Sequence, residues 1–281
     1  MQKLFVLMLV TIGLLACSEV NIPSHVVVEN GALPGRFSIN DSIQIRFSQG
    51  NLQYQASTRI WQFAEHQYDT IGAFNANISE SYNGWIDLFG WGTGDNPAMS
   101  EANFRIYDTF TDWGVNAIRN GGNETHLWRT LTREEWVYLF SFRPHAESLF
   151  GLGSVNGVNG IIILPDTWKT PQGVSFTPST AQGLFIKGES YYNENEDNFS
   201  HNTYTAEQWE AIEIIGAVFL PAAGKRRGAV VAHTDSVGCY WSSTCNPELK
   251  RWGWCLNFNS SSLNSLDGSV RFDGLSVRLV R

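Results

Sequence analysis

Cysteine is the residue type in this chain whose chemistry depends most on spacing. The four cysteines are Cys17, Cys239, Cys245 and Cys255, and the last three lie within one short C-terminal stretch. If Cys17 has a separate role, three remain, and an odd number cannot pair completely in disulfides. Their spacing, Cys239-x5-Cys245-x9-Cys255, matches no usual zinc site, and no histidine follows closely. We therefore expect one disulfide with a free thiol, or free thiols only, in preference to a metal site.

The other residue types that do catalysis form no familiar constellation. The sequence has no Gly-x-Ser-x-Gly elbow, no His-Glu-x-x-His and no complete phosphate-binding loop. Lys225, Arg226 and Arg227 are interpreted as a turn with solvated charge. The six histidines are scattered: His25, His66, His126, His145, His201 and His233. We predict a protein that is not an enzyme and needs no cofactor or metal.

Three aspartates beside aromatic residues allow two interpretations. Asp69, Asp87 and Asp112 could hold a sugar, or they could accept hydrogen bonds in turns. Turn capping is the commoner role of aspartate, and we favour it.

Composition limits the classes that remain. The chain has 281 residues, 43% hydrophobic and 16% charged, which excludes an intrinsically disordered protein. Its formal net charge of -8 disfavours nucleic-acid binding, which needs a basic face. Eleven tryptophans and 26 glycines with few charges favour a compact, loop-rich fold outside the cytoplasm.

The N-terminus is typical of an export signal. Lys3 is followed by an apolar run from Leu4 to Ala16, which is shorter than the roughly 20 residues of a membrane span. The run ends in Leu14-Leu15-Ala16-Cys17, which resembles the lipobox of bacterial lipoproteins. That resemblance implies a signal peptide over 1–16, lipidation of Cys17 and attachment to the membrane through the lipid. We expect a lipidated tether over 17–38, a single domain over 39–281, and a location at the outer membrane or cell surface.

Two helices have clear start signals. Thr132-Arg133-Glu134-Glu135 and Thr205-Ala206-Glu207-Gln208 are capping boxes, each followed by apolar residues at helical spacing. Most other segments read as short strands between Gly- and Asn-rich turns. The expected strands are 42–48, 51–54, 161–164, 183–186, 218–221, 238–243, 255–259, 269–272 and 275–280. This pattern predicts an α+β fold with short antiparallel strands, two or three helices and long loops.

The C-terminal segment carries a distinctive skeleton. Its parts are Tyr240-Trp241-Ser242-Ser243-Thr244, then Leu256-x-Phe258, then Arg271-x-x-Gly274-x-Ser276-Val277-Arg278. This skeleton resembles the end of the C-type-lectin-like domain in bacterial surface lipoproteins and in the variable proteins of diversity-generating retroelements. It is more distantly similar to the formylglycine-generating enzyme family. The resemblance implies a C-type-lectin-like domain whose aromatic skeleton is core and whose intervening residues face outward.

Those intervening residues are the candidate ligand-binding positions. They are Cys239, Cys245, Asn246, Trp252, Trp254, Cys255, Asn257, Asn259, Ser262, Asn264, Asp267 and Asp273. In the retroelement proteins such positions are exchanged within a fixed framework, so this segment is either diversified or merely polar. The calcium-binding Glu-Pro-Asn and Trp-Asn-Asp motifs of animal lectins are absent, so calcium-mediated sugar capture is not implied.

Three functions follow from the sequence. The first is a lipid-anchored envelope binding protein with an unknown protein or glycan ligand. The second is a copper oxidase resembling the formylglycine-generating enzyme, with Cys239 and Cys245 as the candidate ligands. The third is a structural subunit of a surface layer.

Overall fold

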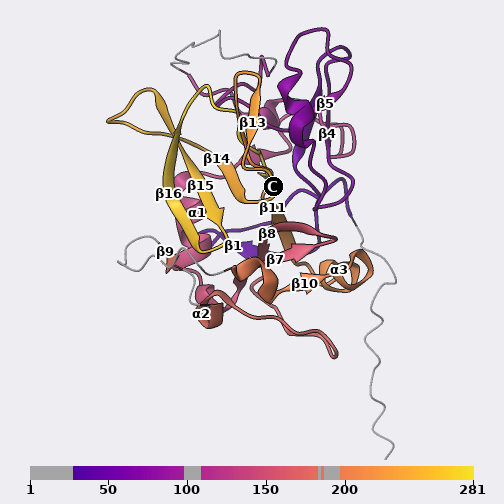
Figure 1. Cartoon of the computed structure of the whole chain (residues 1–281), viewed down its shortest axis with the longest axis vertical. Helices are drawn as coiled ribbons and strands as arrows, with labels where there is room; N and C mark the ends of the chain where they lie inside the picture. Colours follow the sequence, from indigo (N-terminus) through magenta and orange to yellow (C-terminus); the bar gives the residue numbers. More distant parts are fainter. Residues whose placement is uncertain (1–27, 98–108, 183–184, 187–196) are drawn as a thin grey trace, which may run out of the picture.

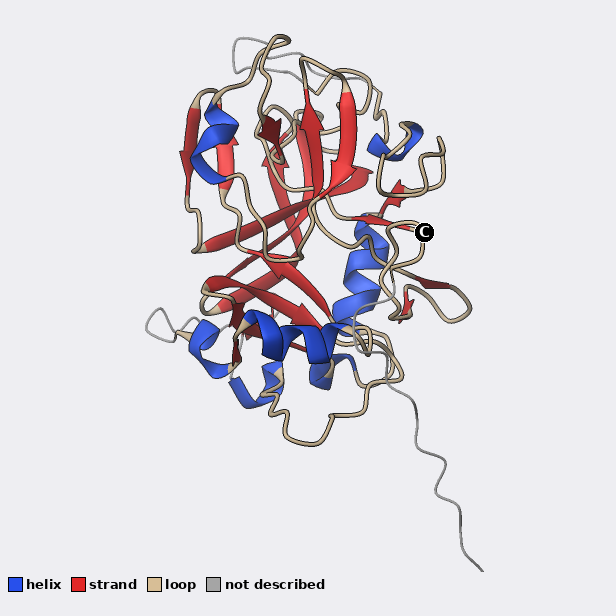
Figure 2. Ribbon diagram, turned by 90° about the vertical axis from the view of Figure 1, so that its right-hand side faces the viewer, coloured by secondary structure: helices blue, strands red, loops and turns tan. Residues whose placement is uncertain are grey.

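Short antiparallel strands dominate the fold. The computed structural model describes residues 28–97, 109–182, 185–186 and 197–281. Within these ranges the chain has three α-helices and six small sheets, so the expected combination of few helices and many antiparallel strands is confirmed. Figure 1 shows β14–β16 and β3–β5 on opposite sides of the molecule, with the β7–β8 sheet below them. Strands and loops form most of the body, and the helices are set around them (Figure 2).

The two largest sheets have four strands each. The C-terminal sheet has the order β14-β15-β16-β9, and the second has the order β10-β7-β8-β11. The C-terminal sheet contains β14 (Val237–Cys245), β15 (Trp252–Asn259), β16 (Ser262–Val270) and β9 (Phe185–Ile186). The second sheet contains β7 (Phe150–Val155), β8 (Val158–Ile163), β10 (Thr203–Tyr204) and β11 (Val218–Pro221).

The other sheets are smaller. A three-stranded sheet consists of β3 (Leu52–Gln55), β4 (Ile60–Phe63) and β5 (Trp85–Ile86). The two-stranded pairs are β1 (Phe37–Ser38) with β2 (Gln44–Ile45), β12 (Lys225–Arg227) with β13 (Val230–Ala232), and β6 (Arg129–Thr130) with β17 (Leu279–Val280). These four small sheets are built from strands of two to four residues.

Both predicted capping boxes begin helices. In α1 (Arg133–Ser141), the Thr132 hydroxyl accepts from the Glu135 amide at 3.2 Å, and the Glu135 carboxylate accepts from the Thr132 amide at 2.7 Å. The same exchange between Thr205 and Gln208 starts α3 (Ala206–Glu213). The remaining helices are α2 (Ser179–Gln182) and the 3₁₀ turns η1 (Gly72–Ala76), η2 (Trp113–Val115), η3 (Ala146–Ser148) and η4 (Asn198–His201).

The core has three apolar clusters. One cluster packs α1 through Trp136 and Leu139 against the C-terminal sheet. A second, rich in tryptophan, contains Trp91, Trp113 and Trp241. The third covers the outer face of the second sheet with Trp209 and Ile212 of α3. The predicted skeleton residues Tyr240, Trp241, Leu256, Phe258, Val277 and Leu279 are all buried, but they are divided between the first two clusters.

Several predicted boundaries are corrected by tertiary packing. In segment 42–48 only Gln44–Ile45 forms a strand, and Ile43 is 51% exposed although we expected it inside. The strand expected at 269–272 starts at Ser262 and ends at Val270, because a turn follows in which the Asp273 amide donates to the Val270 carbonyl at 2.9 Å. In the predicted tether, Leu33 and Phe37 are fully buried, so the packed body starts before residue 39.

The prediction that residues 225–227 form a turn with solvated charge is also wrong. Arg226 is 1% exposed and lies in β12. Its guanidinium donates to the carbonyl of Gly228 at 3.0 Å, and its backbone amide donates to Gly274 at 2.9 Å. Carbonyl acceptors supplied by the fold therefore allow this charge to leave water.

The three aspartates behave as turn acceptors, as we favoured. The Asp69 carboxylate accepts from the His66 amide at 2.8 Å. The Asp112 carboxylate accepts from Gly114 at 2.9 Å at the start of η2. The fully buried carboxylate of Asp87 accepts from the Ile71 amide at 3.0 Å and from the Asn75 side chain at 2.7 Å.

We expect Asp87 to make stability fall as the pH rises. Burial raises the pKa of Asp87 from 3.8 to about 6, against the opposing hydrogen bonds from Ile71 and Asn75. The folded chain therefore keeps a proton that the unfolded chain releases between these two values. The contribution of Asp87 to the free energy of unfolding should drop by roughly 2–3 kcal/mol across this window. It is fully present below about pH 4.

Urea unfolding of the natural chain and of Asp87→Asn between about pH 4 and 7 measures the pH-dependent contribution of Asp87 to stability. The stability difference between the two proteins should change with pH in that window. Parallel stability profiles would show that Asp87 does not titrate as proposed.

No helix in the described part of the chain is long and apolar enough to cross a membrane. The expected signal peptide and Cys17 lie outside the described residues, so the lipid anchor stays a prediction.

Candidate functional site

The C-terminal sheet brings the predicted ligand-binding positions into one region. Strands β14, β15 and β16 form two consecutive antiparallel hairpins, with Trp241 opposite Cys255 and Trp254 opposite Gly268. Ten of the twelve candidates lie on these strands. The other two are Asn246, in the loop between β14 and β15, and Asp273, just after β16.

The two faces of this sheet separate the candidates into two groups. Trp254 lies on the α1 side, because the Arg133 guanidinium at the start of α1 covers its ring at 4.5 Å. Gly253 lies on the other side, where a Cβ would meet the ring of Trp91. Side chains alternate along a strand. Trp252 therefore shares the α1 side with Trp254, whereas Asn257 lies on the opposite face.

Three candidates are corrected by their burial. Cys239, Cys255 and Asp273 are 3%, 2% and 1% exposed, so they cannot touch a ligand on the surface. The Asp273 carboxylate accepts from the Arg227 guanidinium at 2.7 and 2.9 Å, and from the Ser269 hydroxyl at 2.7 Å. Both cysteines belong to the tryptophan-rich cluster. They lie on the same face of the sheet as Asn257, but the tryptophan-rich cluster covers that part of the face, where we expected outward positions.

The three cysteines of this segment are free thiols. Burial raises the pKa of Cys239 to about 12 and raises that of Cys255 well above its usual value. Both thiols therefore stay protonated and unreactive at neutral pH. Of the alternatives left open by the sequence, the structure contains the free thiols, with Cys245 alone exposed.

The two candidate cysteines of the copper oxidase alternative lie in different surroundings, Cys239 buried and Cys245 exposed. Cys239 and Cys245 are six residues apart along β14. Because of a register shift in β14, they face Asn257 and Gly253, four residues apart on β15, which at about 3.3 Å per residue corresponds to roughly 13 Å. In the described ranges, no group of three or more His, Cys, Asp or Glu residues could hold a metal.

The face opposite α1 carries what we call the polar face. Its members are Asn257, Asn259, Ser262, Asn264 and Asp267, all partly exposed. Much of its hydrogen-bonding capacity serves local structure. Asn259 Oδ1 accepts from the amides of Ser261 and Ser262 at 3.0 Å, which closes the β15–β16 turn. Asn264 Oδ1 accepts from the Leu266 amide at 3.0 Å beside a β-bulge.

The α1 side and the β14–β15 loop carry what we call the tryptophan patch. It consists of Arg133, Leu249, Trp252 and Trp254. Leu249 and Trp252 are 53% and 37% exposed, and the Trp252 amide donates to the Leu249 carbonyl at 2.7 Å. The patch therefore presents the side chains of Leu249 and Trp252 to solvent, and its other two members, Arg133 and Trp254, are stacked on each other.

The loop that presents Leu249 is held by local hydrogen bonds. Asn246 Oδ1 accepts from the amides of Glu248 and Leu249, each at 3.0 Å. The Asn246 amide donates to the Trp252 carbonyl at 3.0 Å. Asn246 thus positions the patch, and the exposed Cys245 precedes it.

Sequence reasoning missed two members of the patch. Arg133 was interpreted only as the start of a helix, because nothing local links it to Trp254. Leu249 had a usable signal, since it is a lone apolar residue in the polar loop Asn246-Pro247-Glu248-Leu249-Lys250-Arg251.

Comparison of the chain with protein-family models, curated proteins and solved structures finds no match.

Proposed function

We propose that the chain is a lipid-anchored binding protein of the bacterial envelope that recognises an unknown protein or glycan ligand through the tryptophan patch. The observation that carries this proposal is the exposure of Leu249 and Trp252, which a backbone hydrogen bond joins, with Arg133 stacked on Trp254 on the same side of the sheet as Trp252. Tryptophan and arginine are enriched among the residues that dominate binding energy at interfaces. This composition favours a protein ligand over a glycan.

The proposal includes a C-type-lectin-like arrangement of the body. It is supported by the place of the sequence skeleton: Tyr240 and Trp241 lie in β14, Leu256 and Phe258 in β15, and α1 covers one face of the sheet. In this arrangement the aromatic residues hold the frame, and the β14–β15 loop is free to vary.

Diversification of this segment is a separate part of the proposal. Exchange at Cys245, Asn246 and Trp252 would change the surface, whereas exchange at Cys239 or Cys255 would change the core. A template repeat and a reverse transcriptase in the neighbouring DNA would support it, and their absence would favour a fixed relative.

Binding should depend on Trp252 and not on Asp267. Trp252→Ala removes the exposed anchor and is expected to weaken ligand binding at least tenfold, the equivalent of about 1.4 kcal/mol. Asp267→Asn alters the polar face on the other side of the sheet and serves as the matched control. The full chain in detergent is screened against envelope proteins and a glycan array, and the ligand found is then titrated against both variants.

Weaker binding of Trp252→Ala with an unchanged melting temperature would support the patch. A ligand lost only by Asp267→Asn would place recognition on the polar face and contradict the proposal.

The lipid anchor has its own test. Cells grown with labelled palmitate should incorporate label into the natural chain and not into Cys17→Ser, because the thiol is the acceptor. Equal labelling of the two chains would contradict the anchor.

A further inference from the structure

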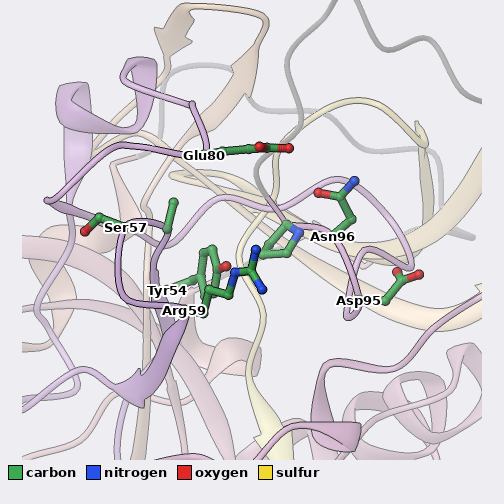
Figure 3. A pocket seen from close by; sticks show the side chains of 8 residues that line it. Tyr54, Ser57, Arg59, Glu80, Asp95 and Asn96 are labelled. Atoms are coloured by element: carbon green, nitrogen blue, oxygen red, sulfur yellow. The ribbon is translucent and has the colours of Figure 1, made fainter.

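An open, mostly polar pocket lies outside the tryptophan patch. It has a volume of about 480 Å³, within the range typical of ligand pockets. Its polar lining comes from the β3–β4 hairpin, from the loop before β5 and from the turn after Gly94 (Figure 3). The residues that carry the argument are Tyr54, Arg59, Glu80, Asp95 and Asn96.

Tyr54 supplies a solvent-accessible hydroxyl that has no hydrogen-bond partner among the described residues. The residue is 7% exposed, and its ring packs on Trp61 with centroids 4.5 Å apart. A tyrosine hydroxyl can both donate to and accept from a hydrogen-bond partner. Within the described residues this hydroxyl has none, and it faces the pocket beside Arg59 in Figure 3. Burial raises the pKa of Tyr54, so the hydroxyl stays a donor at neutral pH.

Arg59 occupies a position where glycine would be less strained. Its φ is 56°, in the left-handed region, and its amide donates to Ala56 at 3.3 Å to close the hairpin turn. The guanidinium extends over Tyr54 into the pocket (Figure 3). It has no carboxylate partner in the described ranges, so its charge is available to a ligand.

Two carboxylates face the same space. Glu80 extends across the pocket above Arg59, and Asp95 lies at its rim (Figure 3). Neither forms an ion pair or hydrogen bond with another described residue. One cation and two anions leave the pocket one charge negative.

We propose that this pocket binds a free dibasic α-amino acid. Arg59 and the Tyr54 hydroxyl bind the ligand carboxylate, Glu80 binds the α-ammonium group, and Asp95 binds the side-chain cation. Asn96, which can donate and accept, completes the lining. A ligand with one negative and two positive groups balances the pocket charge. This inference does not depend on the ligand of the tryptophan patch.

Calorimetric titration of the full chain with L-lysine tests the proposal. L-lysine should bind, and three analogues should each bind about tenfold more weakly, because each lacks one charged contact. These are L-lysine amide without the carboxylate, Nα-acetyl-L-lysine without the α-ammonium group, and L-norleucine without the side-chain cation. No heat of binding for L-lysine at about 10 mM, far weaker than a specific site, would overturn it.

Variants separate the pocket from non-specific attraction to an acidic protein. Arg59→Gly should lower L-lysine affinity about tenfold while keeping or raising the melting temperature, since glycine suits the turn. Glu80→Gln should weaken binding similarly. Arg251→Gln, an exposed arginine outside the pocket, is the matched control and should bind as the natural chain does. Unchanged binding by Arg59→Gly would overturn the proposal.

Discussion

Replacing Arg278 by alanine is expected to lower the free energy of unfolding by about 3–5 kcal/mol, because it removes one partner of a buried charged network. Arg278 is 1% exposed, and its guanidinium donates to Gln67 Oε1 at 2.6 Å and to Asn51 Oδ1 at 3.4 Å. The Gln67 amide in turn donates to Glu213 at 2.8 Å. Burial lowers the pKa of Arg278 to about 10, so the residue is still charged at neutral pH. Alanine would remove the donor to Asn51 Oδ1, leave Gln67 Oε1 with the Phe219 amide alone, and leave Glu213 without its counter-charge.

Urea unfolding at neutral pH measures the effect, with Arg251→Ala as the exposed control that should stay within about 0.5 kcal/mol of the natural chain. Arg278→Met fills most of the volume without the charge and separates packing from electrostatics. If both Arg278 variants unfold at the natural urea midpoint, the network does not stabilise the fold.

Trp241→Ala is expected to cost about 3–5 kcal/mol, a value typical of large aromatic residues in cores. Trp241 is 1% exposed, and its indole nitrogen donates to the Phe89 carbonyl at 2.6 Å. Its backbone amide donates to Ser276 at 3.0 Å, so the residue joins three segments of the chain. Alanine would open a cavity and remove one of the two donors to the Phe89 carbonyl, which keeps the Leu275 amide at 3.0 Å.

Trp252→Ala is the matched comparison in the neighbouring strand. It should cost less than about 1 kcal/mol, because that side chain is already partly in water. Denaturant midpoints of the two variants give the contrast directly. Equal losses would mean that Trp252 is a core residue and that the tryptophan patch does not exist as a surface.

Local signals were enough to predict the helices and much of the C-terminal sheet. The Thr132 and Thr205 capping boxes act within four residues, and both helices begin as predicted. The alternation Leu256-Asn257-Phe258-Asn259 gave the correct inward and outward sides of β15. The same rule, extended to Trp252, would have separated the tryptophans from Asn257, but we grouped them by composition.

Features that depend on distant partners were not predictable from the sequence. Arg226 and Arg278 are buried where oxygens of distant segments, the Leu88 carbonyl and the Gln67 side chain, accept from their guanidinium groups. The stacking of Arg133 on Trp254 joins a helix start to a strand far along the chain. The unpartnered Tyr54 hydroxyl required knowing which loops surround it.

The pairing of the smallest strands has a kinetic consequence. β6 pairs with β17, Phe47 is bridged to Val280, and Phe89 is bridged to Leu275, so early and late segments close the structure together. Such distant pairings require large loops to close before their contacts can form. We therefore expect folding times of roughly milliseconds to seconds, as in other proteins dominated by distant strand pairings. During that search the unpaired strand edges and the three thiols are open to other molecules. Rapid folding assistance is therefore of greater value to this chain than to a helical bundle of the same length.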